Sequence, residues 1–363
     1  TMGYSWQVAL AAVFIEGIIF ILLSLTNVRE AIFNAIPMTL KYAVSAGIGL
    51  FITFIGLQNS GIVKDNSATL VQFHSFTAEG VTRTENVTIV LTLIGIIITA
   101  VLLIKNVKGG ILLGILITWI LGIICQLIGL YVVDAEAGFY SLLPDFSGGI
   151  QLSAIKDVAF KMDFSGIFSL DFLAVMFAFL FVDVFDTLGT LIGVASKANM
   201  LDKDGKLPRI KGALMSDAIG TVVGATLGTS TVTTYVESAT GVTEGGRTGL
   251  TSFVVAILFA VSIILSPIFL AIPSFATAPA LIVVGFYMIT SIVKINFEDM
   301  TEAIPAFLCL IAMPFMYSIS EGICFGIISY VIINLIAGKA KEKKISVLMY
   351  VLTVLFILKY ILL

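Results

Sequence analysis

Apolar stretches close to the length of a membrane-spanning helix recur from one end of the chain to the other. A helix needs about 20 predominantly apolar residues to cross the hydrocarbon core of a bilayer. Hydrophobic residues make up 59% of the 363 positions and charged residues 12%, which is too apolar for a soluble domain. The sequence therefore predicts an all-α polytopic membrane protein. The expected crossings occupy residues 6-25, 37-62, 87-104, 110-132, 170-196, 210-227, 249-271, 277-295, 302-317, 320-337 and 345-362.

Charge and cysteine content argue against several other classes of protein. The 20 basic and 23 acidic residues give a net charge of -3, so no basic excess points to nucleic acid as a partner. Cys125, Cys309 and Cys324 lie in apolar runs and form no CxxC or Cys/His cluster. We therefore expect no disulfide, no metal site and no cofactor. The single histidine, His74, lies in a polar loop and is expected on the solvated surface.

One polar segment, Gly228 to Gly249, lies between two of the apolar stretches. From Thr229 to Val236 it consists almost wholly of Thr, Ser, Val and Tyr, and β-branched side chains favour an extended backbone. Glu237 then opens a short helical piece. A non-helical backbone at membrane depth is tolerated only where protein or a water-filled cavity satisfies its N–H and C=O groups. We therefore predict a short strand plus half-helix that lines a site for a small polar solute.

Two parts of the chain resemble each other. Residues 85-123 align with residues 298-336 without a gap and share a Glu and a Thr three residues later, and each contains a GI-x-x-GI core, displaced by one position between the two. If the strand plus half-helix counts as one crossing, the paired helices lie seven crossings apart. An odd offset places the two copies upside down relative to each other. The sequence therefore predicts two inverted seven-crossing repeats, a plan found in many secondary transporters.

The two copies differ in the length of chain that precedes their matching helices. Residues 170-248 precede the helix at 249-271, whereas only residues 1-5 precede its equivalent at 6-25. We therefore expect three further crossings ahead of Thr1. The predicted divisions are 1-132 for the remainder of the first repeat (crossings four to seven), 133-169 for an extracellular connection, 170-337 for the second repeat (crossings eight to fourteen), and 338-363 for a cytoplasmic basic linker with an extra C-terminal apolar helix.

Basic residues are distributed unevenly between the two sides of the predicted membrane domain, which indicates its orientation. One side carries Lys64, Arg83, Lys156, Lys161 and Lys359, and the other side carries the remaining 15 of the 20. The side richer in Lys and Arg is expected to be cytoplasmic. Loops 64-86 and 133-169 should then face outward.

Acidic side chains inside apolar spans cost about 2.5 to 3.5 kcal/mol each at a helix centre, so they mark candidate functional positions. The chain offers Glu16, Asp183, Asp186, Asp217 and Glu237. Asp183 and Asp186 are three residues apart and share a helix face. Asp186 is the favoured site residue, whereas a structural hydrogen bond is an equal alternative for Asp183. Asp217 is expected to cap or bridge helices, and Glu16 stays unassigned.

The motifs FVDVFDTLGTLIGVASKANML (181-201) and SDAIGTVVGATLGTSTVTTYVESATGVTEGGRTGLTS (216-252) closely resemble the adenine/guanine/hypoxanthine permease branch of the nucleobase transporters. The resemblance extends over essentially the whole chain. It implies a uracil permease-like fold of fourteen crossings, with a core domain that carries substrate and a gate domain that supports a homodimer. It also implies a multi-pass transporter of the cell membrane, not an enzyme, that imports purine bases by proton symport with an elevator-type movement.

Motif matching to this family places the acidic position of the eighth crossing at Asp186 and that of the tenth at Glu237. We predict that both contact the polar edge of a purine base and take part in proton coupling. Asp186 is expected to be the better proton carrier because it lies in a continuous apolar helix. Glu237, at the positive end of a half-helix, should accept hydrogen bonds from the base. The other predicted substrate contacts are Thr231, Thr233, Thr234, Tyr235, Val236 and Phe185.

Two other functions compete with purine transport. An anion transporter of the sulfate/bicarbonate type shares the predicted fold, but two carboxylates at its site would repel an anion. An intramembrane aspartyl protease needs two facing Asp residues, for which Asp186 and Asp217 are the candidates. The glycine-flanked GxGD signature of that class is missing, since Val184 and Phe185 precede Asp186. Which purine is preferred stays open.

Overall fold

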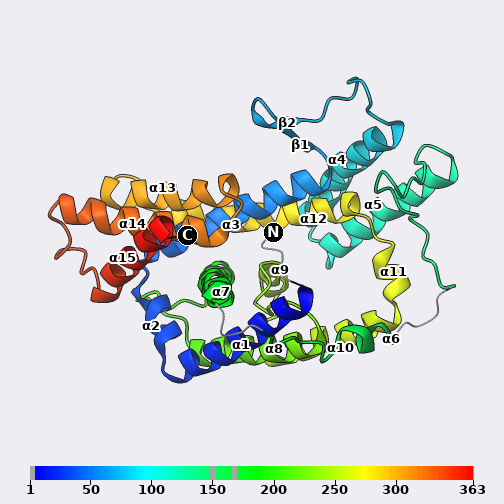
Figure 1. Cartoon of the computed structure of the whole chain (residues 1–363). Helices are drawn as coiled ribbons and strands as arrows, with labels where there is room; N and C mark the ends of the chain where they lie inside the picture. Colours follow the sequence, from blue (N-terminus) through cyan, green and yellow to red (C-terminus); the bar gives the residue numbers. More distant parts are fainter. Residues whose placement is uncertain (1–4, 148–152, 166–169, 363) are drawn as a thin grey trace. The chain divides into compact units, whose positions relative to one another are not determined.

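The computed structural model describes residues 5-147, 153-165 and 170-362, and each predicted apolar crossing is mainly helical in it, with 249-271 divided between two helices (Figure 1). Short elements that the apolar pattern did not predict connect some of the crossings. The elements are α1 (Trp6–Leu25), α2 (Val28–Ala35), α3 (Met38–Asn59), β1 (Val63–Asn66), β2 (Leu70–Phe73), α4 (Arg83–Ile104), α5 (Gly110–Leu127), α6 (Ser153–Val158), α7 (Leu170–Lys197), α8 (Ile210–Leu227), α9 (Ser238–Thr243), α10 (Gly249–Ile264), α11 (Ser266–Leu270), α12 (Ser274–Ile289), the 3-10 helix η1 (Thr290–Lys294), α13 (Met300–Phe315), α14 (Ile319–Ile336) and α15 (Val347–Leu362).

Local sequence signals set several helix ends. At the start of α4, the Thr82 hydroxyl accepts a hydrogen bond from the Glu85 N–H while the Glu85 carboxylate accepts one from the Thr82 N–H, which is a capping box. The Ser318 hydroxyl caps α14 in the same way by accepting from the Glu321 N–H. Helix α8 ends at Gly228, whose φ of 93° is readily adopted only by glycine.

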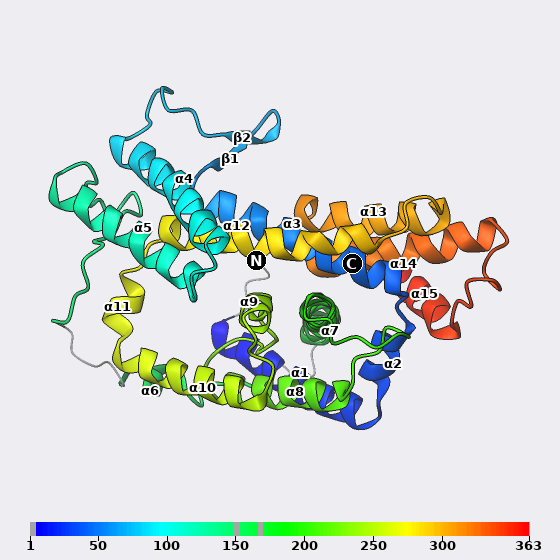
Figure 2. The same cartoon turned by 180° about the vertical axis from the view of Figure 1, so that it is seen from behind.

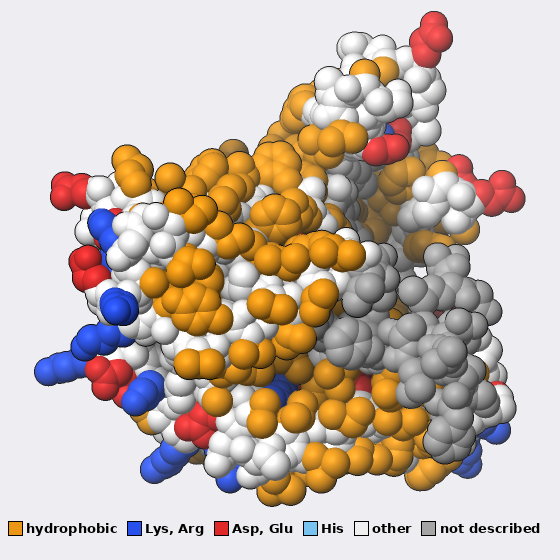
Figure 3. Space-filling model, turned by 60° about the vertical axis from the view of Figure 1, so that its left-hand side comes forward, with side chains coloured by type: hydrophobic (Ala, Val, Ile, Leu, Met, Phe, Trp, Pro, Cys, Tyr) orange, Lys and Arg blue, Asp and Glu red, His pale blue; other side chains and the backbone are white. Residues whose placement is uncertain are grey.

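The surface of the helices suits a lipid environment. In the described part of the chain, six helical spans are long and apolar enough to cross a membrane: Trp6–Leu25, Met38–Asn59, Arg83–Ile104, Gly110–Leu127, Ser274–Lys294 and Ile319–Ile336. Figure 3 shows a face covered largely by apolar side chains, with the charged side chains gathered toward its margins. A soluble protein rarely exposes so large an apolar surface. The chain is therefore a multi-pass membrane protein.

The chain forms two compact units. Unit 1 consists of residues 1-50, 152-239 and 288-363, and unit 2 consists of residues 51-151 and 240-287. In unit 1, α1 packs against α8 and α7, and α13 packs against α14 (Figures 1 and 2). Gly17 makes the α1–α8 approach possible, since a Cβ there would lie 2.7 Å from the Val222 side chain.

In unit 2, α4 packs against α5 through small residues. A Cβ on Gly114 would lie 2.1 Å from the Thr99 hydroxyl, and one on Gly95 would lie 2.6 Å from the Thr118 hydroxyl. The Trp119 indole N–H donates to the Leu142 carbonyl at 3.0 Å, which ties the loop after α5 to that helix. Small residues therefore bring these helices together as they do in unit 1.

The prediction for His74 is wrong. Its side chain is 1% exposed, its Nε2 lies 2.7 Å from the Asn86 amide oxygen, and its ring packs edge-on against Phe76. The hairpin of β1 and β2, with Val63 opposite Phe73, brings the loop back onto the start of α4. The hairpin and the contact with Asn86 bury the ring. The prediction rested on the polar residues next to His74 in the sequence, which do not reveal such contacts.

The predicted strand from Thr229 to Val236 does not form. This segment, called the crossing segment below, has no regular secondary structure before the six-residue helix α9. A strand needs a second strand to pair with, and none lies beside the segment in the described residues. Instead the Thr221 hydroxyl of α8 satisfies both backbone groups of Val232. It accepts from the N–H at 3.2 Å and donates to the C=O at 3.1 Å.

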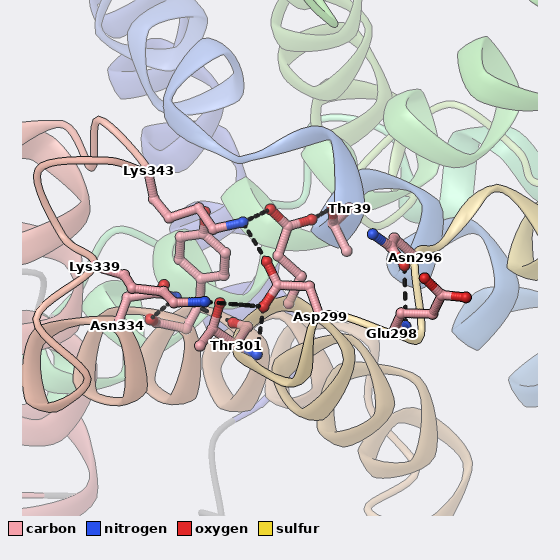
Figure 4. A network of polar contacts seen from close by, with 10 residues as sticks. Thr39, Asn296, Glu298, Asp299, Thr301, Asn334, Lys339 and Lys343 are labelled. Atoms are coloured by element: carbon pink, nitrogen blue, oxygen red, sulfur yellow. Dashed lines mark hydrogen bonds and ion pairs between the residues drawn. The ribbon is translucent and has the colours of Figure 1, made fainter.

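Ion pairs bind the basic linker after α14 to the start of α13, within unit 1 (Figure 4). The Lys343 ammonium donates to Asp299 at 2.6 Å and to Glu302 at 2.5 Å, both at the start of α13. The other carboxylate oxygen of Asp299 accepts from the N–H of Thr301 at 3.0 Å. Helix α15 then returns to the N-terminus of α14, where Glu321 accepts from both Lys359 and Tyr360.

Candidate functional site

A cavity of about 540 Å³ lies within unit 1, where α1, α7 and the crossing segment meet. Its walls combine acidic and hydroxyl side chains with apolar ones. Helix α1 supplies Ala9, Val13 and Glu16; helix α7 supplies Phe179, Val182, Asp183 and Asp186; and the crossing segment supplies Ser230 and Thr231.

Helical spacing explains why these side chains share one space. The four residues of α7 fall at i, i+3, i+4 and i+7, and the three residues of α1 fall at i, i+4 and i+7, so each set occupies a single helix face. The predicted common face of Asp183 and Asp186 is therefore confirmed. The third wall is non-helical backbone, whose Val232 groups are satisfied by Thr221 as described above.

Three carboxylates line the cavity, and they differ in how many of their oxygens have hydrogen-bond partners. Asp183 lies near the Thr231 hydroxyl, and Asp186 lies near the backbone N–H of Ser320 at the start of α14. Each of the two retains one buried oxygen with no hydrogen-bond partner in the described residues. Glu16 is 0% exposed, and neither of its oxygens has such a partner. The cavity thus presents unpaired acceptors from two helices.

Asp217 belongs to a hydrogen-bonded network beside the cavity, although its Oδ1 has no partner in the described residues. The Arg29 guanidinium of α2 donates to Asp217 at 2.9 Å and to the Leu214 carbonyl at 3.2 Å. The Thr187 hydroxyl lies 3.4 Å from Asp217 and 3.0 Å from the Thr233 hydroxyl. The prediction that Asp217 bridges helices is confirmed, because it joins α8 to α2 and α7. Thr233 is held in this network and does not line the cavity.

Other predicted contacts lie outside the cavity wall. Val236 is buried, whereas the Tyr235 side chain is 67% exposed. Glu237 is exposed and directly precedes α9, as predicted, but it does not line the cavity, and neither does Thr234. Among the predicted substrate contacts, Asp186 and Thr231 are the two that the structure places in the wall.

Phe185 points away from the cavity. Its ring is 3% exposed and packs edge-on against Phe356 of α15, with the ring centroids 4.9 Å apart. A helix turns about 100° per residue, so Phe185 cannot share the face occupied by Asp183 and Asp186. The aromatic side chain that does line the cavity is Phe179, one turn before Asp183.

Sequence reasoning identified Glu16 and Asp183 as unusual but assigned neither to the site. For Glu16 the signal was present, since it is the single charged residue of α1. The aspartates that share its cavity lie on α7, more than 160 positions further along the chain, so no local pattern connects them with Glu16. The cavity positions Ala9, Val13, Val182 and Ser230 carried no signal beyond apolarity or small size.

Comparison with known proteins establishes the family. The profile of the permease family matches residues 1-325. The chain is 44% identical to a guanine/hypoxanthine permease of Bacillus subtilis, over 98% of this chain and 76% of that protein. It is 40% identical to a second guanine/hypoxanthine permease of Bacillus subtilis, over 98% and 78%. It is 38% identical to an adenine permease of Escherichia coli, over 99% and 76%.

These matches exclude one of the three functions that the sequence left in competition. A chain related along nearly its whole length to permeases is a transporter and not an enzyme, so Asp186 and Asp217 are not the pair of an intramembrane protease. The arrangement of Asp217 agrees, because it is committed to Arg29. The predicted resemblance to the adenine/guanine/hypoxanthine permease branch is confirmed, and the chain belongs to the permease family.

Proposed function

We propose that the chain imports purine nucleobases across the cell membrane by proton symport, with an elevator-type movement. The observation that carries the proposal is the cavity of unit 1, whose walls hold unpaired carboxylate oxygens between apolar side chains. The names of the relatives, which are guanine/hypoxanthine and adenine permeases, support the choice of a purine.

The chemistry of the walls suits a flat base with N–H groups along its edge. The free oxygens of Asp183 and Asp186 accept from those N–H groups, while the hydroxyls of Ser230 and Thr231 are able to donate to a ring nitrogen or carbonyl. Phe179 and Val182 provide apolar contact for the ring faces. The volume of about 540 Å³ falls within the usual range for a small-molecule site.

The same walls argue against the anion alternative. An anion placed in the cavity would meet Glu16, Asp183 and Asp186, and none of the described lining residues is basic. The nearby Arg29 already donates to Asp217. Repulsion between like charges therefore disfavours sulfate or bicarbonate as substrate.

Elevator transport requires one domain to carry the whole substrate site. Every residue that lines the cavity belongs to unit 1, which supports a role for this unit as the carrier. We propose that Glu237 and residues 233-236 join the substrate contacts when the carrier moves, and that the permease works as a homodimer with its basic linker in the cytoplasm.

Uptake of radiolabelled adenine, guanine and hypoxanthine into cells that express the permease tests the function. Asp186→Asn replaces one acceptor oxygen by a donor, and losing a charge-assisted hydrogen bond to the base should weaken binding by about tenfold or more. Asp204→Asn, at an exposed loop position, is the matched control and should transport normally. Uptake of sulfate in place of purine, or normal purine binding by Asp186→Asn, would contradict the proposal.

A further inference from the structure

Glu16 is the most isolated charged group of unit 1. Its side chain is 0% exposed in the middle of α1, and both carboxylate oxygens lack a hydrogen-bond partner in the described part of the chain. It also lines the cavity that holds Asp183 and Asp186. A buried carboxylate without hydrogen bonds costs several kcal/mol when ionised, and such groups usually take up a proton instead.

The surroundings of Glu16 do not offset this cost. The charged groups that act on it are Asp183 from α7, Asp217 from α8 and Arg29 from α2. Two of these are carboxylates. The third, Arg29, is engaged with Asp217, with the Leu214 carbonyl and with the face of the Phe20 ring at 4.3 Å. Because the carboxylate of Asp217 offsets most of the positive charge of Arg29, Arg29 does little to stabilise an ionised Glu16.

The other two carboxylates of the cavity are better supported as anions. Each of them has one buried oxygen without a hydrogen-bond partner in the described residues, whereas Glu16 has two. Asp183 also lies near the Thr231 hydroxyl, and Asp186 lies near a backbone N–H at the N-terminus of α14, where the helix dipole favours negative charge. When several carboxylates share a site, the least supported one binds the proton first. In this cavity that group is Glu16.

We propose that Glu16 is the residue that binds the transported proton. One proton adds to a carboxylate oxygen of Glu16 and converts it to the neutral acid, and the same proton leaves when the site opens to the other side. This assignment differs from the one predicted by motif matching, which gave proton coupling to Asp186 and Glu237. It leaves Asp186 ionised throughout as an acceptor for the base.

Repulsion between Glu16 and Asp183 couples the proton to the base. While Glu16 is ionised, the Glu16 and Asp183 carboxylates share one cavity and repel each other. This repulsion opposes the close arrangement of the two side chains that a bound base requires. Protonation of Glu16 removes this repulsion and lets Asp183 and Asp186 accept from the base. Binding of the base then favours binding of the proton, and the reverse holds equally. The inference rests on the proposed function, since it assigns the proton of that symport.

The test is the dissociation constant of a radiolabelled purine, measured against pH on the purified full-length permease. With one linked proton, the dissociation constant of the parent should rise about tenfold per pH unit above the midpoint of Glu16 titration. Glu16→Gln keeps the shape of the protonated acid, so it should bind purine at every pH with a flat profile. Glu16→Asp keeps a titratable group and should keep the slope. Glu342→Gln, at an exposed linker position, should match the parent.

The outcomes separate this inference from the proposed function. A parent protein that binds no purine refutes the proposed function, and one that binds purine equally at all pH values refutes proton coupling. If the parent shows the slope and Glu16→Gln shows it too, Glu16 is not the proton site. A Glu16→Gln protein that fails to fold also contradicts the proposal, because an amide of the same shape should relieve a buried charge; thermal melting provides this control.

Discussion

The acidic residues of unit 1 differ in what surrounds them, and this difference gives each its role. Asp217 is paired with Arg29, and removal of one partner from such a buried pair costs about 3 to 5 kcal/mol, which is typical of a structural group. The three carboxylates of the cavity keep unpaired oxygens, as Asp217 does, but they line an open space and form no ion pair in the described residues, which is typical of groups that meet a ligand or a proton. Their positions on one face of α7 could be predicted from the sequence. The pairing of Asp217 with a residue of α2 could not, since 188 positions separate it from Arg29.

Asp299, which precedes the predicted crossing at 302-317, forms an ion pair with Lys343 of the linker at 2.6 Å. Hydrogen bonds from the Lys343 ammonium and from Thr301 hold the pKa of Asp299 well below its usual range. Its side chain is partly solvated, with 24% exposed, so solvent screening limits the energy of the pair.

A lowered pKa in the folded state predicts how stability depends on pH. The contribution of Asp299 is fully present above the pKa of an unfolded aspartate, about 3.9, and is lost as the pH falls through the lower folded value. Asp299→Asn should therefore lower the melting temperature by a constant amount from pH 8 to pH 5, and by less as the pH falls below about 4. Glu298→Gln, next to it and exposed, is the control. A deficit of Asp299→Asn that instead grows with acidity would refute this role.

At the scale of elements, helices were predicted well and the crossing segment was not. Each apolar run carries its own signal, and the start of α8 at Ile210 and its end at Leu227 match the prediction. The crossing segment has strand-like composition, but strand formation depends on a partner elsewhere in the chain. The aligned segments 85-123 and 298-336 each form a pair of packed helices, α4 with α5 and α13 with α14. The inverted relation between the two copies stays a prediction.

The Thr221 hydroxyl makes two of the hydrogen bonds that hold the crossing segment against α8. Thr221→Val removes both hydrogen bonds to Val232 while it keeps the side-chain shape, and the unpaired backbone groups should cost about 1 to 3 kcal/mol. Because Ser230 and Thr231 would shift with the backbone, purine affinity should fall as well. The matched control is Thr226→Val on the same helix, whose hydroxyl bonds, in the described residues, to the Val222 carbonyl of its own helix. Calorimetric titration and thermal melting measure both effects, and equal behaviour of the two variants would show that the contact is not needed.

For the whole molecule, composition alone was enough to predict a multi-pass membrane protein, and the family matches confirm it. The count of Lys and Arg residues that predicts the orientation in the membrane has to omit two residues. Arg29 and Lys41 are both fully buried, and the Lys41 ammonium donates to the Gly205 carbonyl at 2.6 Å, so neither is a solvated cation of a loop. Without these two, 13 basic residues on one side still face five on the other, which leaves the predicted orientation unchanged.

Labelling of single cysteines in intact cells tests that orientation. In a background where Cys125, Cys309 and Cys324 are replaced, Thr77→Cys and Asp204→Cys each place one thiol at an exposed loop position. The excess of Lys and Arg should hold the loop around Asp204 in the cytoplasm. An impermeant maleimide should therefore modify Thr77→Cys and leave Asp204→Cys untouched until the membrane is permeabilised, when both should react. The reverse pattern would overturn the orientation. Reaction of both thiols, or of neither, in sealed cells would place the two loops on the same side and refute the count of crossings from which the inverted repeat was predicted.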